Sequence, residues 1–170
     1  MITPPTFSQV FTLPAAVSIS SLTVSALVQI NTISQSLMVT STATIVGSVT
    51  STIGALTFQK QDAGLGLTIA AGSVSSTSGL ISASSTIIAA GGVLANNSGN
   101  IYISGDMVNS GNINPAGAGS FQIDGNLINV LGAGVFLTPG PLLLVEVVIR
   151  HFKCVILLPL PSIKQLARSR

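Results

Sequence analysis

Side chains that could perform acid–base chemistry are few and lie far apart in the sequence. The acidic residues are Asp62, Asp106, Asp124 and Glu146. Polysaccharide hydrolases and lyases need clustered carboxylates, either as general acid and base or as metal ligands. Asp106 and Asp124 each adjoin a glycine, which is typical of a turn in which an aspartate bonds nearby backbone. We interpret both as corner residues, so the sequence nominates no catalytic, cofactor-binding or metal-ligating residue.

The one histidine, His151, lies three residues before the one cysteine, Cys154. A Cys–His nucleophilic pair also needs a group that orients the histidine and a pocket around the sulfur. Spacing alone indicates neither, and accidental proximity is the favoured interpretation. A single cysteine also excludes an intrachain disulfide and a cysteine-rich metal site. The sequence therefore predicts a protein that is not an enzyme and has no cofactor.

The composition favours strands and excludes several other classes of protein. Charged residues make up 6% of the chain and hydrophobic residues 47%, against roughly 25% charged residues in an average domain. Disordered chains combine low hydrophobicity with high charge, which is the opposite pattern. Five of the six basic residues lie in the last 21 positions, so the body lacks the basic face that a nucleic-acid partner requires. No apolar stretch reaches the length of about 18 residues that a membrane-spanning helix needs.

Alternation of apolar and polar residues with period two, the pattern of strands, recurs along the chain. It predicts strands over residues 17–24, 45–53, 55–58, 65–69 and 101–103. Clusters of Asn, Asp and Gly separate later strands and favour tight corners. The Ser and Thr rows of the first half predict a flat hydroxyl face for solvent or carbohydrate. No amphipathic helix is evident before position 140.

The second half of the chain matches itself when the sequence is shifted by 20 residues. The matching pairs are Gly99 on Gly119, Ile101 on Phe121, Ile103 on Ile123, Gly105 on Gly125, Asp106 on Asn126, Met107 on Leu127, Val108 on Ile128 and Asn109 on Asn129. One step earlier the pairs are Gly79 on Gly99, Ile81 on Ile101, Ile87 on Met107 and Ile88 on Val108, and one step further back Leu67 on Ile87.

A repeat of about 20 residues corresponds to one coil of a parallel β-solenoid. Stacked coils place equivalent residues above one another at about 4.8 Å. We expect Gly105 and Gly125 at one stacked corner, and Asn109 and Asn129 at another, with hydrogen bonds between the stacked asparagines.

The stretch from Gly99 to Asn129, with its recurring Gly-Asp/Asn and Asn-x-Gly-x-Ile elements, resembles bacterial autotransporter passengers and filamentous-haemagglutinin-type adhesins. The resemblance covers residues 79–138, and residues 15–78 by composition only. It implies a right-handed parallel β-helix, export from the cell, and a surface or adhesive role. The chain start lacks the basic and apolar regions of a signal peptide, so we expect that export information lies elsewhere or that the chain is a fragment.

Three segments are expected: a lead-in or cap over residues 1–14, a solenoid over 15–140 and an atypical apolar and basic tail over 141–170. The tail loses Ser, Thr, Asn and Gly abruptly. It is either a native cap or anchor, because solenoid ends need covering, or a sequence unrelated to the fold, as from a shifted frame or truncated gene. The change in composition favours the second interpretation.

The predicted function is a non-catalytic structural or adhesive segment of a secreted or cell-surface β-solenoid. Its expected partners are surface glycans, matrix or neighbouring solenoid chains. The alternative is a fragment of a carbohydrate-active β-helix enzyme, a lyase or hydrolase. A third possibility is a fragment that does not fold alone and aggregates through unpaired strand edges.

Overall fold

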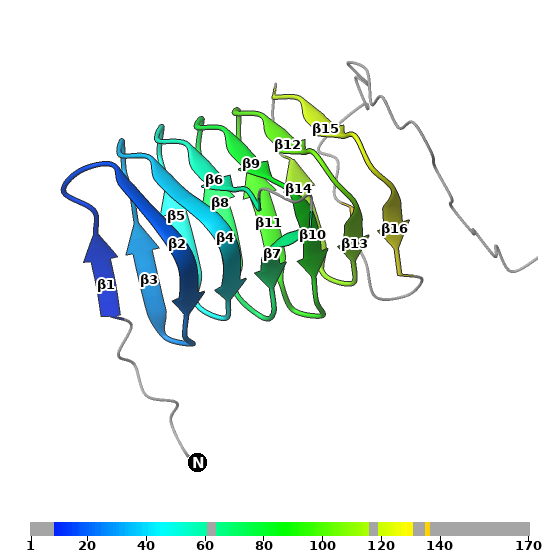
Figure 1. Ribbon diagram of the computed structural model, residues 1–170, viewed down its shortest axis with the longest axis horizontal. Helices are drawn as coiled ribbons and strands as arrows, with labels where there is room; N and C mark the ends of the chain where they lie inside the picture. The colour runs from blue at the N-terminus through cyan, green and yellow to red at the C-terminus, as the bar shows by residue number, and fades with distance from the viewer. Residues whose placement is uncertain (1–8, 61–63, 116–118, 131–134, 137–170) are drawn as a thin grey trace, which may run out of the picture.

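The computed structural model describes residues 9–60, 64–115, 119–130, 135 and 136. In these ranges every regular element is a strand, and the strands pair in parallel (Figure 1). Successive coils stack side by side, about six in number, and each coil passes once through each of two sheets. The predicted all-β solenoid is therefore confirmed.

The first sheet, called sheet A, takes one short strand from each of the six coils and a seventh strand from the chain that follows the sixth coil. Its seven strands are, in spatial order, β1 (Gln9–Thr12), β3 (Val28–Asn31), β5 (Ser48–Ser51), β8 (Ser73–Ser76), β11 (Val93–Asn96), β14 (Asn112–Pro115) and β17 (Val135–Phe136).

The second sheet, sheet B, is built differently at its two ends. Coils 1 and 2 each contribute one long strand, β2 (Val17–Val24) and β4 (Leu37–Ile45). Each later coil contributes two short strands, which are β6 (Leu56–Phe58) with β7 (Leu65–Ile69), β9 (Ile81–Ala83) with β10 (Ser85–Ile88), β12 (Ile101–Ile103) with β13 (Met107–Asn109), and β15 (Phe121–Ile123) with β16 (Leu127–Asn129). Coils 3 to 6 are numbered accordingly.

The core lies between the two sheets and consists of stacked columns of inward side chains. One column runs through Leu37, Leu56, Ile81, Ile101 and Phe121, each of them at most 8% exposed. A single coil cannot enclose such residues, whereas a neighbour on each side removes them from water. Full burial of one such side chain stabilises the fold by about 2 kcal/mol, so stacking supplies the driving force.

The register predicted from the repeat is confirmed across the last coils. Ile101 pairs with Phe121, and Ile103 with Ile123. The same holds for Met107 with Leu127, Val108 with Ile128 and Asn109 with Asn129, and one step earlier for Ile81 with Ile101. The predicted asparagine bond is present, since Asn109 Nδ2 donates to Asn129 Oδ1 at 2.7 Å.

The register predicted for Ile87 and Ile88 is wrong by one residue. Ile87 pairs with Val108 rather than Met107, and Thr86 takes the inward position beside Met107. Leu67 accordingly pairs with Thr86. The cause is a shorter corner in coil 4. Thr86 is three residues after Ala83 in the sequence, whereas their partners in coil 5 are four residues apart. A slip of one residue exchanges the two faces of a strand, so Ile87 points outward.

The strands over residues 17–24, 65–69 and 101–103 are as predicted, and that over 55–58 differs by one residue. The strand predicted over 45–53 is wrong, because a corner at Val46 and Gly47 separates β4 from β5. The N–H groups of both corner residues donate to the carbonyl of Val24, at 2.8 and 3.0 Å. A Cβ on Gly47 would collide with the carbonyl oxygens of Val28 and Ser25, so the chain can bend here only with glycine.

Coil 3 is longer than the others, which explains why the self-match fades towards the N-terminus. The sequence distance from Leu56 of β6 to its partner Ile81 exceeds the distance from Ile81 to its own partner Ile101. Part of the extra length lies between β6 and β7. The segment assigned to the lead-in contains β1, which pairs with β3. The tail over 141–170 lies outside the described residues.

Candidate functional site

The two aspartates of the described chain hold neighbouring coils together. Asp124 accepts a hydrogen bond from Tyr102 Oη at 2.6 Å and one from Gln122 Nε2 at 2.8 Å. The Tyr102 bond, which joins coils 5 and 6, raises the pKa of the phenol because it favours the protonated form beside a carboxylate. The Oδ1 atom of Asp106 accepts from the backbone N and from Nδ2 of Asn126, at 2.8 and 3.0 Å.

Both aspartates lie at corners between short sheet B strands, and their bonds to Tyr102 and Asn126 join neighbouring coils, whereas the sequence predicted bonds to nearby backbone. Asp62, Glu146, His151 and Cys154 lie outside the described residues. Within the described ranges, no group of three or more His, Cys, Asp or Glu side chains could hold a metal ion. No helix in the same ranges has the length and apolar character needed to cross a bilayer.

Buried polar side chains at equivalent positions close the corners at the ends of two neighbouring sheet A strands, β8 and β11. Ser76 Oγ accepts from the N–H of Gly79 at 2.9 Å, and Asn96 Oδ1 accepts from the N–H of Gly99 at the same distance. Asn96 Nδ2 also donates to the carbonyls of Gly79 and Asn100. Buried polar groups must be paired in this way to avoid a desolvation cost. These side chains therefore belong to the framework of the solenoid.

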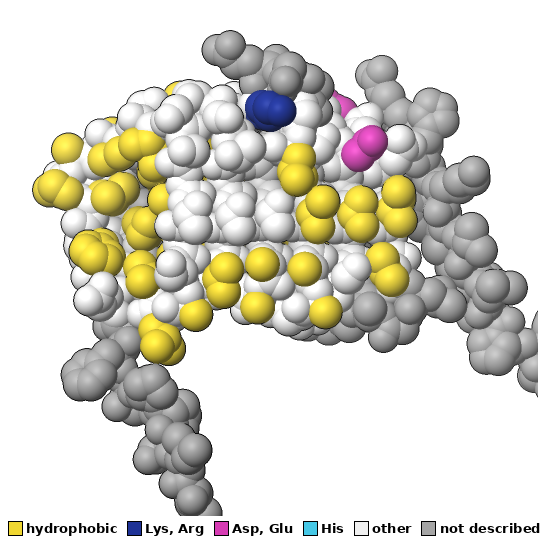
Figure 2. Space-filling model, turned by 60° about the horizontal axis from the view of Figure 1, so that its bottom comes forward, with side chains coloured by type: hydrophobic (Ala, Val, Ile, Leu, Met, Phe, Trp, Pro, Cys, Tyr) yellow, Lys and Arg dark blue, Asp and Glu magenta, His cyan; other side chains and the backbone are white. Residues whose placement is uncertain are grey.

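The outward face of sheet B changes chemistry halfway along the solenoid. One outward column is Thr23, Thr44, Thr68, Ile87, Val108 and Ile128 in successive coils. Figure 2 shows the change as white side chains followed, on one level, by yellow ones towards the C-terminal end. The predicted hydroxyl face is thus present in coils 1 to 3 and is replaced by an apolar stripe in coils 4 to 6.

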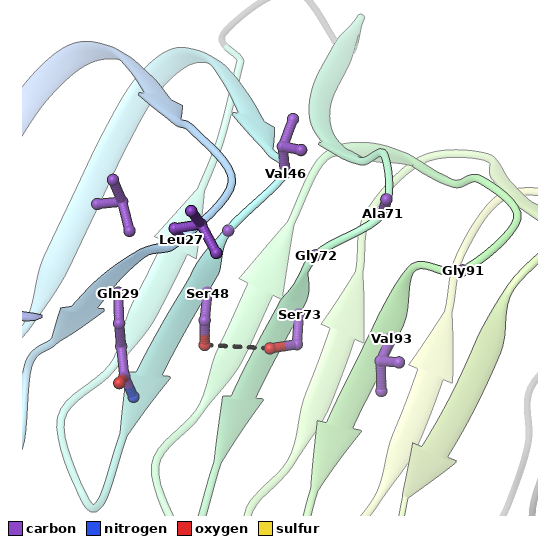
Figure 3. A pocket seen from close by; sticks show the side chains of 11 residues that line it. Leu27, Gln29, Val46, Ser48, Ala71, Gly72, Ser73, Gly91 and Val93 are labelled. Carbon is purple, nitrogen blue, oxygen red and sulfur yellow. Dashed lines mark hydrogen bonds between the residues drawn. The ribbon is translucent and has the colours of Figure 1, made fainter. Parts of the chain in front are cut away.

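A shallow groove crosses coils 2 to 5, where the chain passes from sheet B to sheet A (Figure 3). Its volume is about 410 Å³, within the range of ligand sites. Eleven residues line it: Leu27, Val28, Gln29, Val46, Gly47, Ser48, Ala71, Gly72, Ser73, Gly91 and Val93. None of these side chains is charged. The groove is therefore an open, uncharged hollow on the described part of the chain.

Two polar clusters lie on the sheet A side of the groove. Ser73 Oγ donates to Ser48 Oγ at 3.1 Å, shown as the dashed line in Figure 3. Gln29 Nε2 donates to Thr50 Oγ1 at 3.3 Å. Backbone groups along the groove are already paired across coils, since the N–H of Ser73 donates to Gly47 and that of Val93 to Gly72. The polar groups left for a ligand are therefore mainly hydroxyls and one amide.

Sequence reasoning missed the groove, although the glycines that form it are visible in the sequence. A Cβ on Gly72 would collide with the carbonyl of Gly47, so the backbones of adjacent coils approach closely here and leave a hollow outside. The long third coil separates Gly47 from Gly72 by more than one ordinary repeat. A search at a single fixed period therefore does not align them.

No protein-family model matches this chain, no curated protein matches it, and no solved structure matches it. The fold alone defines its class, which is the parallel β-solenoid repeat proteins.

Proposed function

We propose that this chain is a non-catalytic structural or adhesive segment of an exported, surface-exposed β-solenoid. The observation that carries the proposal is the outer surface, where side chains of one chemical kind form straight columns along successive coils. The Thr23–Thr44–Thr68 and Ile87–Val108–Ile128 runs are the clearest case. Such a surface repeats one contact along its length and suits binding spread over a face rather than chemistry at one point.

Two further features support this proposal. The described chain has three charged side chains, Lys60, Asp106 and Asp124, and both aspartates bond between coils. The likeness of residues 99–129 to autotransporter passengers and haemagglutinin-type adhesins points to the same extracellular or cell-surface role. Surface glycans, matrix or neighbouring solenoid chains are the partners that fit an uncharged face.

The test is an adhesion assay on the full chain. Beads coated with the chain, or with albumin as control, are applied to surfaces carrying mucin, cellulose or peptidoglycan, and retention is measured under flow. We expect retention on at least one surface above the albumin level. The same polysaccharides are incubated with soluble chain, and release of reducing ends or unsaturated products is followed. Product release that is lost in Asp106→Asn or Asp124→Asn would contradict the proposal and favour the enzymatic alternative.

A further inference from the structure

The groove across coils 2 to 5 combines three properties that together select a ligand class. It is uncharged, it follows the solenoid axis, and its polar groups are hydroxyls and an amide. An ionic ligand would lose hydration without gaining a counter-charge, which is unfavourable. The lining touches four coils, so its length is roughly 14 Å at about 4.8 Å per coil spacing. The ligand should therefore be neutral and extended.

We propose that this groove binds a neutral oligosaccharide laid along the solenoid axis. This inference rests on the proposed adhesive function and specifies one site for it.

The hydrogen-bonding groups that the groove offers favour a sugar over a peptide as its ligand. A peptide that binds by adding a strand needs an edge with unpaired main-chain groups. At this groove the N–H groups of Val46, Gly47, Ser73 and Val93 already donate to backbone carbonyls. A sugar instead needs side-chain donors and acceptors. The Ser48 hydroxyl accepts from Ser73 and can donate its own hydrogen, and the Gln29 carbonyl oxygen can accept.

Leu27 supplies the apolar contact at one end of the groove. Its backbone has φ 66°, a left-handed conformation that costs a non-glycine residue about 1 kcal/mol or more. Its side chain is 52% exposed, so burial in the core does not explain why leucine occupies this position. A strained, exposed apolar residue at the rim is accounted for if it packs against the carbon–hydrogen face of a sugar ring.

The experiment measures oligosaccharide binding to the full chain by titration calorimetry and saturation-transfer NMR. The probes are the neutral oligomers cellohexaose, xylohexaose, mannohexaose and maltohexaose, with oligogalacturonate as a charged comparison. Ala71→Trp places a large side chain in the groove at an exposed lining residue. Its matched control, Thr77→Trp, adds the same side chain at an exposed position beyond the far end of β8, outside the lining.

We expect at least one neutral oligomer to bind, oligogalacturonate to bind far more weakly, and Ala71→Trp to reduce affinity at least about tenfold. Thr77→Trp should leave the affinity unchanged. Leu27→Gly removes the apolar rim and relieves the backbone strain, so it should weaken binding while the melting temperature stays level or rises. This variant keeps the test open even if Ala71→Trp does not fold.

Failure of the groove and failure of the adhesive role give different results. If no neutral oligomer binds, or if Ala71→Trp and Leu27→Gly bind as tightly as the unaltered chain, the groove proposal is overturned. Beads that still adhere to polysaccharide surfaces in that case leave the adhesive function standing through another face. Binding in the groove without bead adhesion would instead support the site and contradict the adhesive role.

Discussion

The N-terminal and C-terminal coils share one core but fix their register by different means. In coils 1 and 2, sheet B is formed by unbroken strands of eight and nine residues, β2 and β4. In coils 5 and 6 the same path is split into three-residue strands. The inward columns continue through both regions, so burial alone does not decide where a strand must break.

What differs is the chemistry of the corners. The later coils place glycine at one repeated corner, through Gly54, Gly79, Gly99 and Gly119, where each added Cβ would meet the backbone of the coil before. In coil 2 the same corner is occupied by Gln35, whose backbone lies against Gly54, and not by a glycine. Alternation therefore specifies the N-terminal register, while close backbone contacts specify the C-terminal one. Four predictions test this difference, from the largest expected effect to the smallest.

Gly99→Ala should destabilise the C-terminal coils by about 3 kcal/mol, because the new Cβ collides with the carbonyl of Gly79. The measurement is the free energy of unfolding in urea. Gly91→Ala is the control, since its Cβ would meet nothing closer than 4.0 Å and only its φ of +85° is unfavourable. We expect a loss of about 1 kcal/mol there. Equal losses at both positions would show that close coil contact is not what requires glycine.

Asn96→Ala should cost about 2 kcal/mol, because it removes the partner of the Gly99 N–H and of the Gly79 carbonyl at this corner. The Asn100 carbonyl loses one bond but still accepts from the N–H of Ile81. Ser76→Ala, at the equivalent position one coil earlier, removes the partner of the Gly79 N–H and should cost about 1 kcal/mol. Chemical denaturation compares the two variants. A larger loss at Ser76 would contradict the view that asparagine is the stronger corner link.

Thr32→Val should stabilise the chain by about 1 kcal/mol. Thr32 is fully buried, and its Oγ1 is the single buried side-chain polar atom without a partner in the described residues. The control is Thr86→Val, since the Thr86 hydroxyl is also buried but donates to the Ser84 carbonyl at 3.5 Å. Calorimetric melting should show a gain for Thr32→Val alone. No gain would mean that the N-terminal coils do not carry this unpaired hydroxyl in solution.

Tyr102 should titrate with a pKa above its ordinary value of 10.0, because the neutral phenol donates to Asp124. Its contribution to stability is therefore complete below about pH 10 and is lost as the pH rises through the raised pKa of the folded state. Tyr102 is the only tyrosine and the chain has no tryptophan, so ultraviolet absorbance reports on it directly. Asp124→Asn should lower this pKa, and an unchanged titration would rule out the bond between coils 5 and 6.

Sequence reasoning succeeded where corners are regular and failed where they change length. The pairing of residues 99–109 with 119–129 was predictable because glycine and asparagine mark the same corners in both coils. The register of Ile87 was predicted wrongly because the sequence does not show which of two adjacent isoleucines faces the core. Thr86 and Ile88 can both be buried, so the alternation of apolar residues fits either register. The hydroxyl face was predictable from alternation. The groove was not, because it depends on how closely backbones approach across the long third coil.

The scarcity of charge in the described part of the chain has a consequence for the conditions in which the solenoid works. Dissolved salt weakens attraction between exposed charges, with a screening length of about 10 Å at 0.1 M. Three charged side chains leave such screening little to act on. Coil stacking through apolar columns, and any contact made through uncharged faces, should therefore lose little strength when the salt concentration rises from that of fresh water to that of brine.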